Sequence, residues 1–492
     1  DHFIEQVRSI RPSFIGVLST FGETYSHVVT EAWAAGVPVL GTGLGAVKER
    51  IEAHGGGWII DHRDPQHAYD QIVAISSDPA VYEEGRSTAT LNGVRTVAEM
   101  TSDYANLYAD IAQVRRPFHF EDASAVLGRR VLRVGALVAG EAPRHPASVH
   151  IRTLLRLHHP TISNRIVTTV VDIDRFLDGA RQDFDIMVVQ RTAIPPERTA
   201  DFVEVCRDLD IAIVFDIDDD LWALPPESDE YAAYQPALEG LEVLARNADA
   251  VTVSTQPLHE RMEQFSDSVV TVPNSLDERL WFSGLTTASD SRPWASGGLV
   301  SHEAGVVKIL YYGTATHRLD LELFQPALEA FRARSGLDVH FVVAGGQPSD
   351  DQWFERMPIP PNVRHYPDFV LWLRETAREF DFGVAPLVDN TFNASKSDLK
   401  YLEFAAIGLP AIYSNVPSFA SVTDGETGLL ATTQDEWVEC LSQMAADRDR
   451  RDRIRSNAYD DVVEHRLLGP VATGYFDELL RIAPPSEAKV DD

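Results

Sequence analysis

Two stretches of the chain, far apart in the sequence, repeat one pattern of a glutamate, a glycine five residues later and a proline seven residues later. The first stretch contains Glu31, Gly36 and Pro38, and the second contains Glu403, Gly408 and Pro410. Glu31 and Glu403 lie 372 residues apart, as do Gly56 and Gly428. A repeat with so long a period indicates the duplication of a whole domain, not a solenoid.

The glutamate of each stretch has the chemistry to hold a sugar. A carboxylate can accept hydrogen bonds from both hydroxyls of a vicinal diol, such as that of a ribose. Helical spacing places each glutamate in the second turn of a predicted helix, and a helix N-terminus favours a negative phosphate. Glu31 and Glu403 are therefore candidate nucleotide ligands. The alternative, for charged residues at this spacing alone, is a solvated helix face.

The residues that precede these glutamates differ between the two stretches. Glu23 lies eight residues before Glu31, whereas the equivalent position in the second stretch is Ser395. The second stretch carries Lys396 and Lys400 instead, whose ammonium groups could face phosphates as point charges. The first stretch thus offers a second carboxylate, and the second stretch offers cations.

Both stretches lie between apolar segments of the length that is typical of buried strands. Residues 14–18 and 37–40 flank the first stretch, and residues 382–387 and 409–413 flank the second. The order strand, loop, helix, strand is typical of a parallel doubly wound sheet. The sequence therefore predicts an α/β protein built from Rossmann-like lobes.

The first stretch resembles the E-x7-E signature of retaining GT-B glycosyltransferases (glycosyltransferase family 4-like, glycosyl transferases group 1). This resemblance implies a GT-B fold with the motif in its C-terminal, donor-binding lobe. It also implies that Glu23 contacts the transferred sugar and Glu31 the ribose. The second stretch resembles relatives with the pattern S-x-x-K-x-x-E, so the ribose role carries over to Glu403, while the sugar-contact role does not carry over to Ser395.

Size and composition limit the classes of function. A chain of 492 residues is too long for one core, so two to four lobes are expected. The net charge of −32 disfavours nucleic acid as a partner. Two cysteines, Cys206 and Cys440, provide neither a disulfide framework nor a zinc site. No apolar run of about 18 residues predicts a membrane span.

The predicted organisation is one donor-type lobe followed by one complete two-lobe unit. Residues 1–118 form the donor-type lobe of a truncated first copy, and the chain opening in mid-domain predicts upstream domains of the same polypeptide. A linker at 119–128 leads to an N-terminal, acceptor-side lobe at 129–282. A linker at 283–305 precedes the C-terminal, nucleotide-sugar-binding lobe at 306–483, in which 363–366 is a predicted strand, and an acidic tail spans 484–492.

The N-terminal lobe has two groups of candidate acceptor contacts after its predicted strands. Arg144 and His145 lie in the loop after residues 130–139, and Arg152 lies in the helix that follows. Loops at the carboxyl ends of parallel strands line the ligand crevice of such a sheet. Ordinary surface basic residues are the alternative for each of the three.

The second group is the segment Asp216-Ile-Asp-Asp-Asp-Leu-Trp222, in which Asp218 and Asp219 are the candidate acceptor-side residues. Clustered carboxylates after a strand could bind Mg²⁺ or Mn²⁺. The segment also resembles D-I-D-D-D-L-W of some bacterial GT-B glycosyltransferases, whose chemistry is metal-independent. Polar contact with an acceptor, a metal site and a helix-capping turn remain as alternatives, and no metal ligand is assigned.

The C-terminal lobe supplies the candidate phosphate contacts. Gly313 and Thr314 follow a predicted strand at 307–312 and can bring backbone amides to a pyrophosphate. Arg318, Lys396 and Lys400 are the candidate catalytic residues, which would stabilise negative charge on a leaving phosphate. His317 is interpreted as a structural histidine.

The resemblance implies sugar transfer from a nucleotide-diphosphate sugar to a saccharide or lipid-linked acceptor, with no cofactor. The tandem organisation is similar to that of bacterial surface-polysaccharide assembly, and a cytoplasmic location or one at the inner face of the membrane follows. A non-catalytic scaffold or glycan-binding module is the main alternative. A sugar-nucleotide epimerase of the same fold and a phosphorylase are weaker alternatives, because no pyridoxal-lysine signature is present and two linked copies favour transfer.

Overall fold

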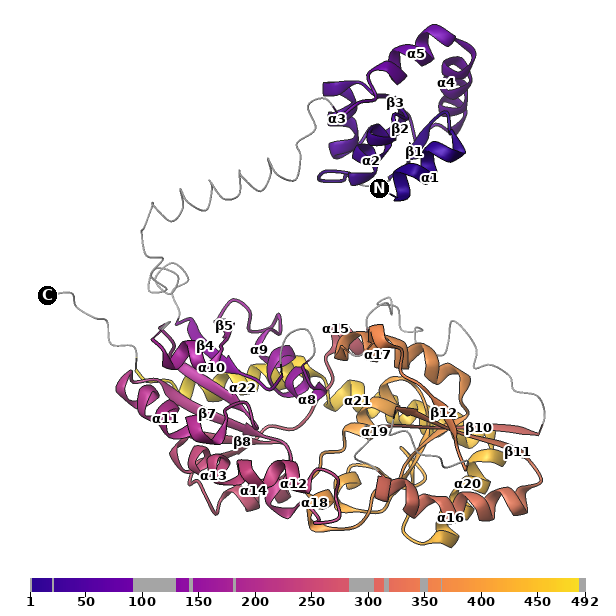
Figure 1. The fold of residues 1–492 in the computed structure, drawn as a ribbon. Helices are drawn as coiled ribbons and strands as arrows, with labels where there is room; N and C mark the ends of the chain where they lie inside the picture. The colour runs from indigo at the N-terminus through magenta and orange to yellow at the C-terminus, as the bar shows by residue number, and fades with distance from the viewer. Residues whose placement is uncertain are drawn as a thin grey trace, which may run out of the picture. The chain divides into compact units, whose positions relative to one another are not determined.

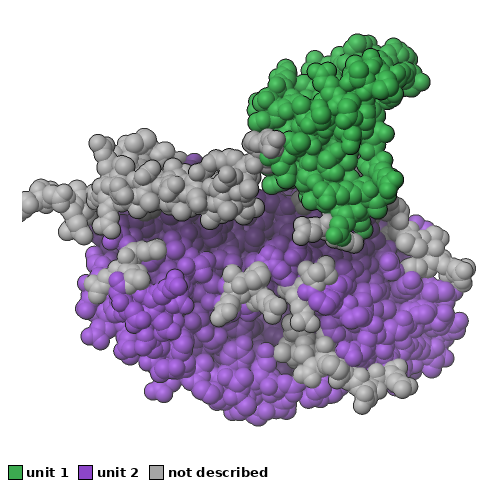
Figure 2. All heavy atoms as spheres, turned by 45° about the horizontal axis from the view of Figure 1, so that its top comes forward, with its two compact units in different colours: residues 1–118 green, residues 119–492 purple. Residues whose placement is uncertain are grey.

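The structure is a computed structural model of the chain. It describes residues 2–19, 22–91, 130–140, 145–179, 183–282, 305–313, 318–345, 353–363 and 365–485. The chain divides into two compact units, residues 1–118 and residues 119–492, which Figure 2 colours separately.

The first unit contains a three-stranded parallel sheet with the order β1-β2-β3. Its strands are β1 (Ile15–Val17), β2 (Val39–Thr42) and β3 (Gly57–Ile60). Its helices are α1 (His2–Ile10), α2 (His27–Ala35), α3 (Gly45–His54), α4 (Pro65–Ser77) and α5 (Pro79–Ser87). Helices α2 and α3 pack on one face of the sheet, and α4 and α5 pack on the other.

The N-terminal lobe of the second unit contains a six-stranded parallel sheet with the order β5-β4-β6-β7-β8-β9. Its strands are β4 (Leu132–Leu137), β5 (Ile166–Val170), β6 (Ile186–Gln190), β7 (Ala212–Ile217), β8 (Ala250–Val253) and β9 (Val269–Thr271). The chain moves outward from β4 to β5 and then returns past β4 to β6. The direction of strand addition therefore reverses between β4 and β6.

Helices cover both faces of this sheet. A helix from Ala147 to Leu157, α8 (Ala147–Val149) and α9 (Leu155–Leu157) with a π-helical turn at His150–Leu154 between them, follows β4. The other helices are α10 (Ile173–Leu177), α11 (Thr199–Asp208), α12 (Tyr231–Tyr234), α13 (Leu238–Asn247) and α14 (Gln256–Met262). Helix α15 (Glu278–Trp281) follows β9 and packs on the C-terminal lobe. Separate apolar clusters on the two faces form the core.

The C-terminal lobe contains a second six-stranded parallel sheet, with the order β12-β11-β10-β13-β14-β15. Its strands are β10 (Val306–Gly313), β11 (Asp338–Gly345), β12 (Glu355–Met357), β13 (Phe382–Ala385), β14 (Ala411–Ser414) and β15 (Leu429–Ala431). Numbered within the lobe, this order is 3-2-1-4-5-6, that of dinucleotide-binding folds, and it reverses between β10 and β13.

The helices of the C-terminal lobe are α16 (Arg318–Ser335), α17 (Tyr366–Thr376), α18 (Thr391–Ala394), α19 (Leu399–Ala406), α20 (Gln434–Ala446) and α21 (Arg448–His465). The last helix, α22 (Leu468–Ile482), returns to the N-terminal lobe and packs on it through residues such as Tyr475 and Phe476 (Figure 1). The predicted α/β class, with doubly wound parallel sheets in GT-B-type lobes, is confirmed.

One strand and one helix of the first unit keep the offset of the sequence repeat to elements of the C-terminal lobe. Strand β2 and strand β14 begin 372 residues apart, and so do helices α2 and α19. Gly36 and Gly408 end these helices with positive φ values of 75° and 69°, which glycine adopts without strain. The segment before the helix is longer in the C-terminal lobe, because Val39 pairs with Ile15 whereas Ala411 pairs with Gly383.

One predicted strand is wrong. Residues 361–363 form a short 3₁₀ turn, and α17 begins at Tyr366 with Pro367 in its first turn, where proline is well tolerated. The edge strand is β12 at Glu355–Met357 instead. The predicted linker at 119–128 and most of the linker at 283–305 and of the tail lie outside the described residues. Among the described residues, no helix has the length and apolar character that crossing a membrane requires.

Candidate active site

A pocket lies between the two lobes of the second unit, at the carboxyl ends of strands from both sheets. Pro225, Glu227, Ser228 and Asp229 line it from the N-terminal lobe, and Arg318, Leu319, Asp320, Val388, Asn390, Phe392, Asn393 and Lys396 line it from the C-terminal lobe. The C-terminal residues follow β10 and β13, the two strands at the reversal point of that sheet. Ligands of open α/β sheets bind at such points, so the topology and the pocket indicate the same place.

The C-terminal wall of the pocket carries two cationic side chains, those of Arg318 and Lys396, together with the buried carboxylate of Asp320. The Arg318 side chain is half exposed at the start of α16, and its Nη1 lies 2.6 Å from Oε1 of Glu322. The Nζ of Lys396 lies 4.8 Å from the centre of the Phe392 ring. Two of the three predicted catalytic residues therefore line one pocket.

The N-terminal wall of the pocket is anionic. Glu227 and Asp229 are exposed on the segment between β7 and α12. Burial raises the pKa of the neighbouring Glu230, and the positive charges of Arg191 and Lys396 oppose that rise. The exposed carboxylates of the N-terminal wall thus lie across the pocket from Arg318 and Lys396 of the C-terminal wall.

Glu403 lies in a buried contact between α19 and β10. Its Oε2 accepts a hydrogen bond of 2.7 Å from the hydroxyl of Tyr312, at the end of β10. The Nζ of Lys400 lies 3.9 Å from the same oxygen and 3.4 Å from the centre of the Tyr312 ring. Burial raises the pKa of Glu403, while Lys400 and the Tyr312 hydroxyl oppose the rise. Lys400 therefore stabilises the carboxylate of Glu403.

Lys400 is affected by the same burial. The loss of solvent lowers the pKa of its ammonium group to about 8, although Glu403 favours the charged form. The structure thus places Lys400 against Glu403 and Tyr312. Lys400 is not one of the residues that line the pocket with Arg318 and Lys396. Tyr312 was absent from the sequence-based candidates, although it immediately precedes the predicted phosphate-binding Gly313.

Ser395 is buried, and both its hydroxyl and its carbonyl contact other residues of the chain. Its hydroxyl lies 3.4 Å from the carbonyl oxygen of Thr391, one turn earlier in α18. Its own carbonyl accepts a 2.7 Å hydrogen bond from the hydroxyl of Thr255 in the N-terminal lobe. Ser395 therefore joins the two lobes. Gly313 lies at the end of β10, as predicted, and Thr314 lies outside the described residues.

The predicted acceptor-side aspartates share one arginine. Nη2 of Arg191 lies 2.9 Å from Asp219, and Nη1 lies 3.5 Å from Asp218. Arg191 follows β6, has a positive φ of 50° and also lies over the ring of Tyr234. Burial raises the pKa of Asp218 to about 6, against the opposing charge of Arg191. Arg191 was missed as a site residue, although it follows a strand end just as the aspartates do.

The basic acceptor-side candidates do not form one group. Arg152 lies in the core with a fully buried side chain, where it binds Asp216 through two hydrogen bonds of 3.0 Å and 2.8 Å. This places the guanidinium away from any accessible surface. The ring of His145 is partly buried, and its Nδ1 lies 3.0 Å from the carbonyl oxygen of Ala139. Arg144 lies outside the described residues.

In the first unit, the two predicted donor contacts lie on either side of the start of α2. Glu23 accepts a hydrogen bond from the hydroxyl of Ser19, and the hydroxyls of Ser19 and Ser26 lower the pKa of its carboxyl group. Glu31 is exposed in the second turn of α2, the same position that Glu403 occupies in α19. The structure therefore gives Glu31 and Glu403 equivalent helical positions and different environments.

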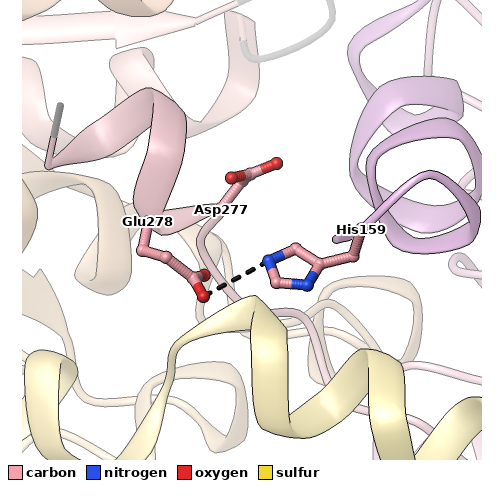
Figure 3. Close-up of side chains that lie close together, drawn as sticks. All are labelled: His159, Asp277 and Glu278. Atoms are coloured by element: carbon pink, nitrogen blue, oxygen red, sulfur yellow. Dashed lines mark ion pairs between the residues drawn. The ribbon is translucent and has the colours of Figure 1, made fainter. Parts of the chain in front are cut away.

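Within the described parts of the chain, one group brings three possible metal-ligand atoms within 4.8 Å of one another: His159, Asp277 and Glu278 (Figure 3). Nε2 of His159 lies 3.2 Å from Oε1 of Glu278. The carboxylate of Asp277, however, already accepts hydrogen bonds from the backbone and the guanidinium of Arg279. The group joins the N-terminal lobe to the start of α15, and it is not the predicted cluster at residues 216–220.

One segment of the chain is similar to a known family. Residues 307–447 match the family model described as Glycosyl transferases group 1. No curated protein matches the chain in sequence. The structure of HepE from Anabaena with UDP and glucose has a TM-score of 0.49 and 11% identity, covering 71% of this chain and 100% of that chain.

Two further solved structures have similar scores. A glycosyltransferase from Rickettsia africae has a TM-score of 0.48 and 9% identity, covering 73% of this chain and 100% of its own. The pneumococcal O-GlcNAc transferase GtfA, in complex with UDP and GlcNAc, has a TM-score of 0.42 and 14% identity, covering 63% of this chain and 59% of its own. The segment that matches the glycosyl transferases group 1 model, residues 307–447, contains Arg318, Lys396, Lys400 and Glu403.

Proposed function

We propose that the chain is a glycosyltransferase that moves a sugar from a nucleotide-diphosphate sugar to a hydroxyl of a saccharide or a lipid-linked acceptor. The observation that supports this proposal is the pocket between the lobes, whose two cationic side chains lie within the segment that matches the glycosyl transferases group 1 model. A diphosphate is attracted to Arg318 and Lys396, and sugar hydroxyls are suited to the carboxylates and amides around them.

The reaction breaks the bond between the anomeric carbon and the diphosphate oxygen and forms a bond from that carbon to the acceptor oxygen. The leaving diphosphate gains negative charge as the bond breaks. Arg318 and Lys396 would stabilise that charge, which is the main catalytic contribution expected of such a site. Glu403, held by Tyr312 and Lys400, would bind the ribose hydroxyls of the donor.

Finer features of the proposal follow from the family resemblance. We infer transfer of a hexose with retention of the anomeric configuration, in which the acceptor proton passes to the leaving phosphate oxygen. Bacterial cell-surface polysaccharide synthesis on the cytoplasmic side of the membrane is the proposed setting. The first unit is proposed to be the donor-type lobe of a second, truncated copy of the same fold.

A second candidate function is a non-catalytic scaffold or glycan-binding module within a larger glycosyltransferase. One observation favours it: Glu403 is buried in contact with Tyr312 and Lys400, and the Ser395 hydroxyl is directed to Thr391. A degenerate site that no longer binds a donor could keep such internal contacts. The two functions differ in whether the purified chain responds to any nucleotide sugar.

The test is a panel of nucleotide sugars with the purified chain, scored for hydrolysis and for thermal shift. A glycosyltransferase should give both responses with at least one donor, and Glu403→Gln should weaken them. Glu375→Gln is the matched control, because Glu375 is an exposed glutamate whose ion pair is with Arg378, three residues away. If neither response appears for any donor, the catalytic proposal is wrong and the scaffold is favoured. Activity that survives EDTA would exclude a required metal at residues 216–220.

A further inference from the structure

The segment of the C-terminal lobe that carries Lys396 is in contact with the N-terminal lobe. Helix α18, just before Lys396, packs against the short 3₁₀ turn at Leu221–Ala223, which follows β7. Phe392 of α18 is 8% exposed and belongs to an apolar cluster of the N-terminal lobe. The Nζ of Lys396 lies 4.8 Å from the centre of that ring. The backbone around Lys396 is therefore placed by both lobes.

Two side chains of the N-terminal lobe hold the backbone on either side of Lys396. The hydroxyl of Thr255, at the start of α14, donates a 2.7 Å hydrogen bond to the carbonyl oxygen of Ser395. That oxygen belongs to the peptide bond that joins Ser395 to Lys396. On the other side, Nδ2 of Asn274 donates a 2.7 Å hydrogen bond to the hydroxyl oxygen of Ser397. Lys396 thus lies between two anchors that come from the other lobe.

Two arginines fix Asn274 in turn. Its Oδ1 accepts a 3.0 Å hydrogen bond from the buried Arg152, which leaves Nδ2 as the donor of the amide group. Its backbone carbonyl accepts a 3.1 Å hydrogen bond from Arg466. Arg466 also binds Asp398 of the Lys396 segment, through hydrogen bonds of 2.6 Å and 2.8 Å. A side chain that is fixed by such contacts can hold its neighbour in one position.

A lysine gains more from such support than an arginine does. Its ammonium group is a point charge at the end of a flexible four-carbon chain, and ordering that chain costs conformational entropy. A fixed backbone limits the positions that the ammonium group can reach, so less freedom is lost when an anion binds. Arg318 differs from Lys396, because it begins α16 of its own lobe and its ion pair is with Glu322 of the same helix.

We propose that Thr255 and Asn274 are positioning residues for Lys396. They are not among the residues that line the pocket, and they act by holding the chain on both sides of Lys396. The inference rests on the proposed function, in which Lys396 binds the diphosphate of the donor. It adds that this binding depends on contact between the lobes, although Lys396 itself belongs to the C-terminal lobe.

The experiment is a double-mutant cycle, measured by titration calorimetry on the whole chain. The ligand is whichever of UDP, GDP, ADP and TDP the wild type binds most tightly. Thr255→Val removes the hydroxyl at nearly constant volume and should weaken binding about three- to tenfold, whereas Thr255→Ser should restore it. In the Lys396→Gln background, Thr255→Val should change the affinity by less than about twofold, because its effect passes through Lys396.

Thr433→Val is the matched control, because Thr433 caps α20 with its hydroxyl as Thr255 caps α14, and α20 belongs to the C-terminal lobe. It should bind the nucleotide as the wild type does. Unchanged binding by Thr255→Val, or an equal loss with and without Lys396, would overturn the inference and leave the proposed function standing. If Thr255→Val does not fold, Ser397→Ala takes its place in the cycle, since it removes the acceptor of the Asn274 hydrogen bond.

If the wild type binds none of the nucleotides, the proposed function is wrong, and hydrogen exchange measured by mass spectrometry decides the inference. Faster exchange of the backbone amides of residues 396–398 in Thr255→Val and Ser397→Ala, but not in Thr433→Val, would support the anchoring of this segment. Equal exchange in the wild type and all three variants would refute it.

Discussion

Glu403 illustrates how two neighbours determine what one buried carboxylate can do. A solvated glutamate needs no help to stay ionised, but burial favours its neutral form. Here the Tyr312 hydroxyl and the Lys400 ammonium both favour the ionised form of the same side chain. The proposed ribose ligand therefore depends on two residues that need not touch the ribose themselves.

Tyr312→Phe should weaken donor binding about tenfold, because the 2.7 Å hydrogen bond to Glu403 is lost and a buried acceptor is left with one partner fewer. Titration calorimetry with the best nucleotide sugar measures the change. Tyr311→Phe is the matched control, since Tyr311 is the preceding residue of β10 and packs in the cluster on the opposite face of the sheet. Equal losses for both variants would refute the specific role of Tyr312.

Lys400 predicts the pH dependence of donor binding. Its pKa is lowered to about 8, so it loses its proton as the pH rises through that value, and its support of the ionised Glu403 is lost. The affinity for the donor should therefore be highest below pH 8 and should fall above it. Lys400→Arg should bind the donor with an affinity that does not fall between pH 7 and 9.5, because arginine keeps its charge throughout. A fall of the same size in this variant would show that another group titrates.

At the scale of the elements, the sequence predicted most strands well because buried parallel strands are short apolar runs that end at turn residues. Residues 307–312 were predicted as a strand, and β10 spans Val306–Gly313. The predicted strand at 363–366 failed because Pro367 favours a helix start there, and the true edge strand, Glu355–Met357, contains two charged residues. An edge strand with little burial has no apolar pattern to detect.

The site was only partly predictable for a related reason. Arg318 and Lys396 follow strand ends, and the rule for parallel sheets places such residues at the crevice. Nothing in the local pattern distinguishes Arg152, which is buried in an ion pair, from an arginine on a helix surface. The contacts of Glu403 with Tyr312, 91 residues away, depend on how β10 and α19 pack, which spacing along the chain does not contain.

Helix ends give a prediction that belongs to this scale. Gly336 follows α16 with a φ of 64° and open space around its Cβ position, so Gly336→Ala should destabilise the second unit by about 1 kcal/mol through backbone strain alone. Gly474 has the same open space but lies inside α22 without a positive φ. Gly474→Ala should stabilise the unit by roughly 0.5–1 kcal/mol. Chemical denaturation measures both changes, and the same sign for both would contradict the explanation.

At the scale of the whole molecule, the net charge of −32 contrasts with the local charge of the pocket. A diphosphate is repelled by the acidic surface as a whole, and the pocket offers it Arg318 and Lys396 on one wall only. In the proposed function the two lobes therefore bind different groups. The C-terminal lobe binds the anionic diphosphate of the donor, and the acidic N-terminal wall binds sugar hydroxyl groups. The residues for these two kinds of binding come from different sheets, so neither lobe would form the site alone.

The most direct test of this account is a calorimetric titration of the whole chain with UDP, GDP, ADP and TDP. The wild type should bind at least one of them, and the double variant Arg318→Gln/Lys396→Gln should bind it at least about tenfold more weakly, since two charge-assisted contacts are lost. The double variant Arg246→Gln/Arg378→Gln loses the same charge from exposed local pairs and should bind as the wild type does. A wild type that binds none of the four nucleotides, or a pocket variant that binds as tightly as the wild type, would contradict the central claim.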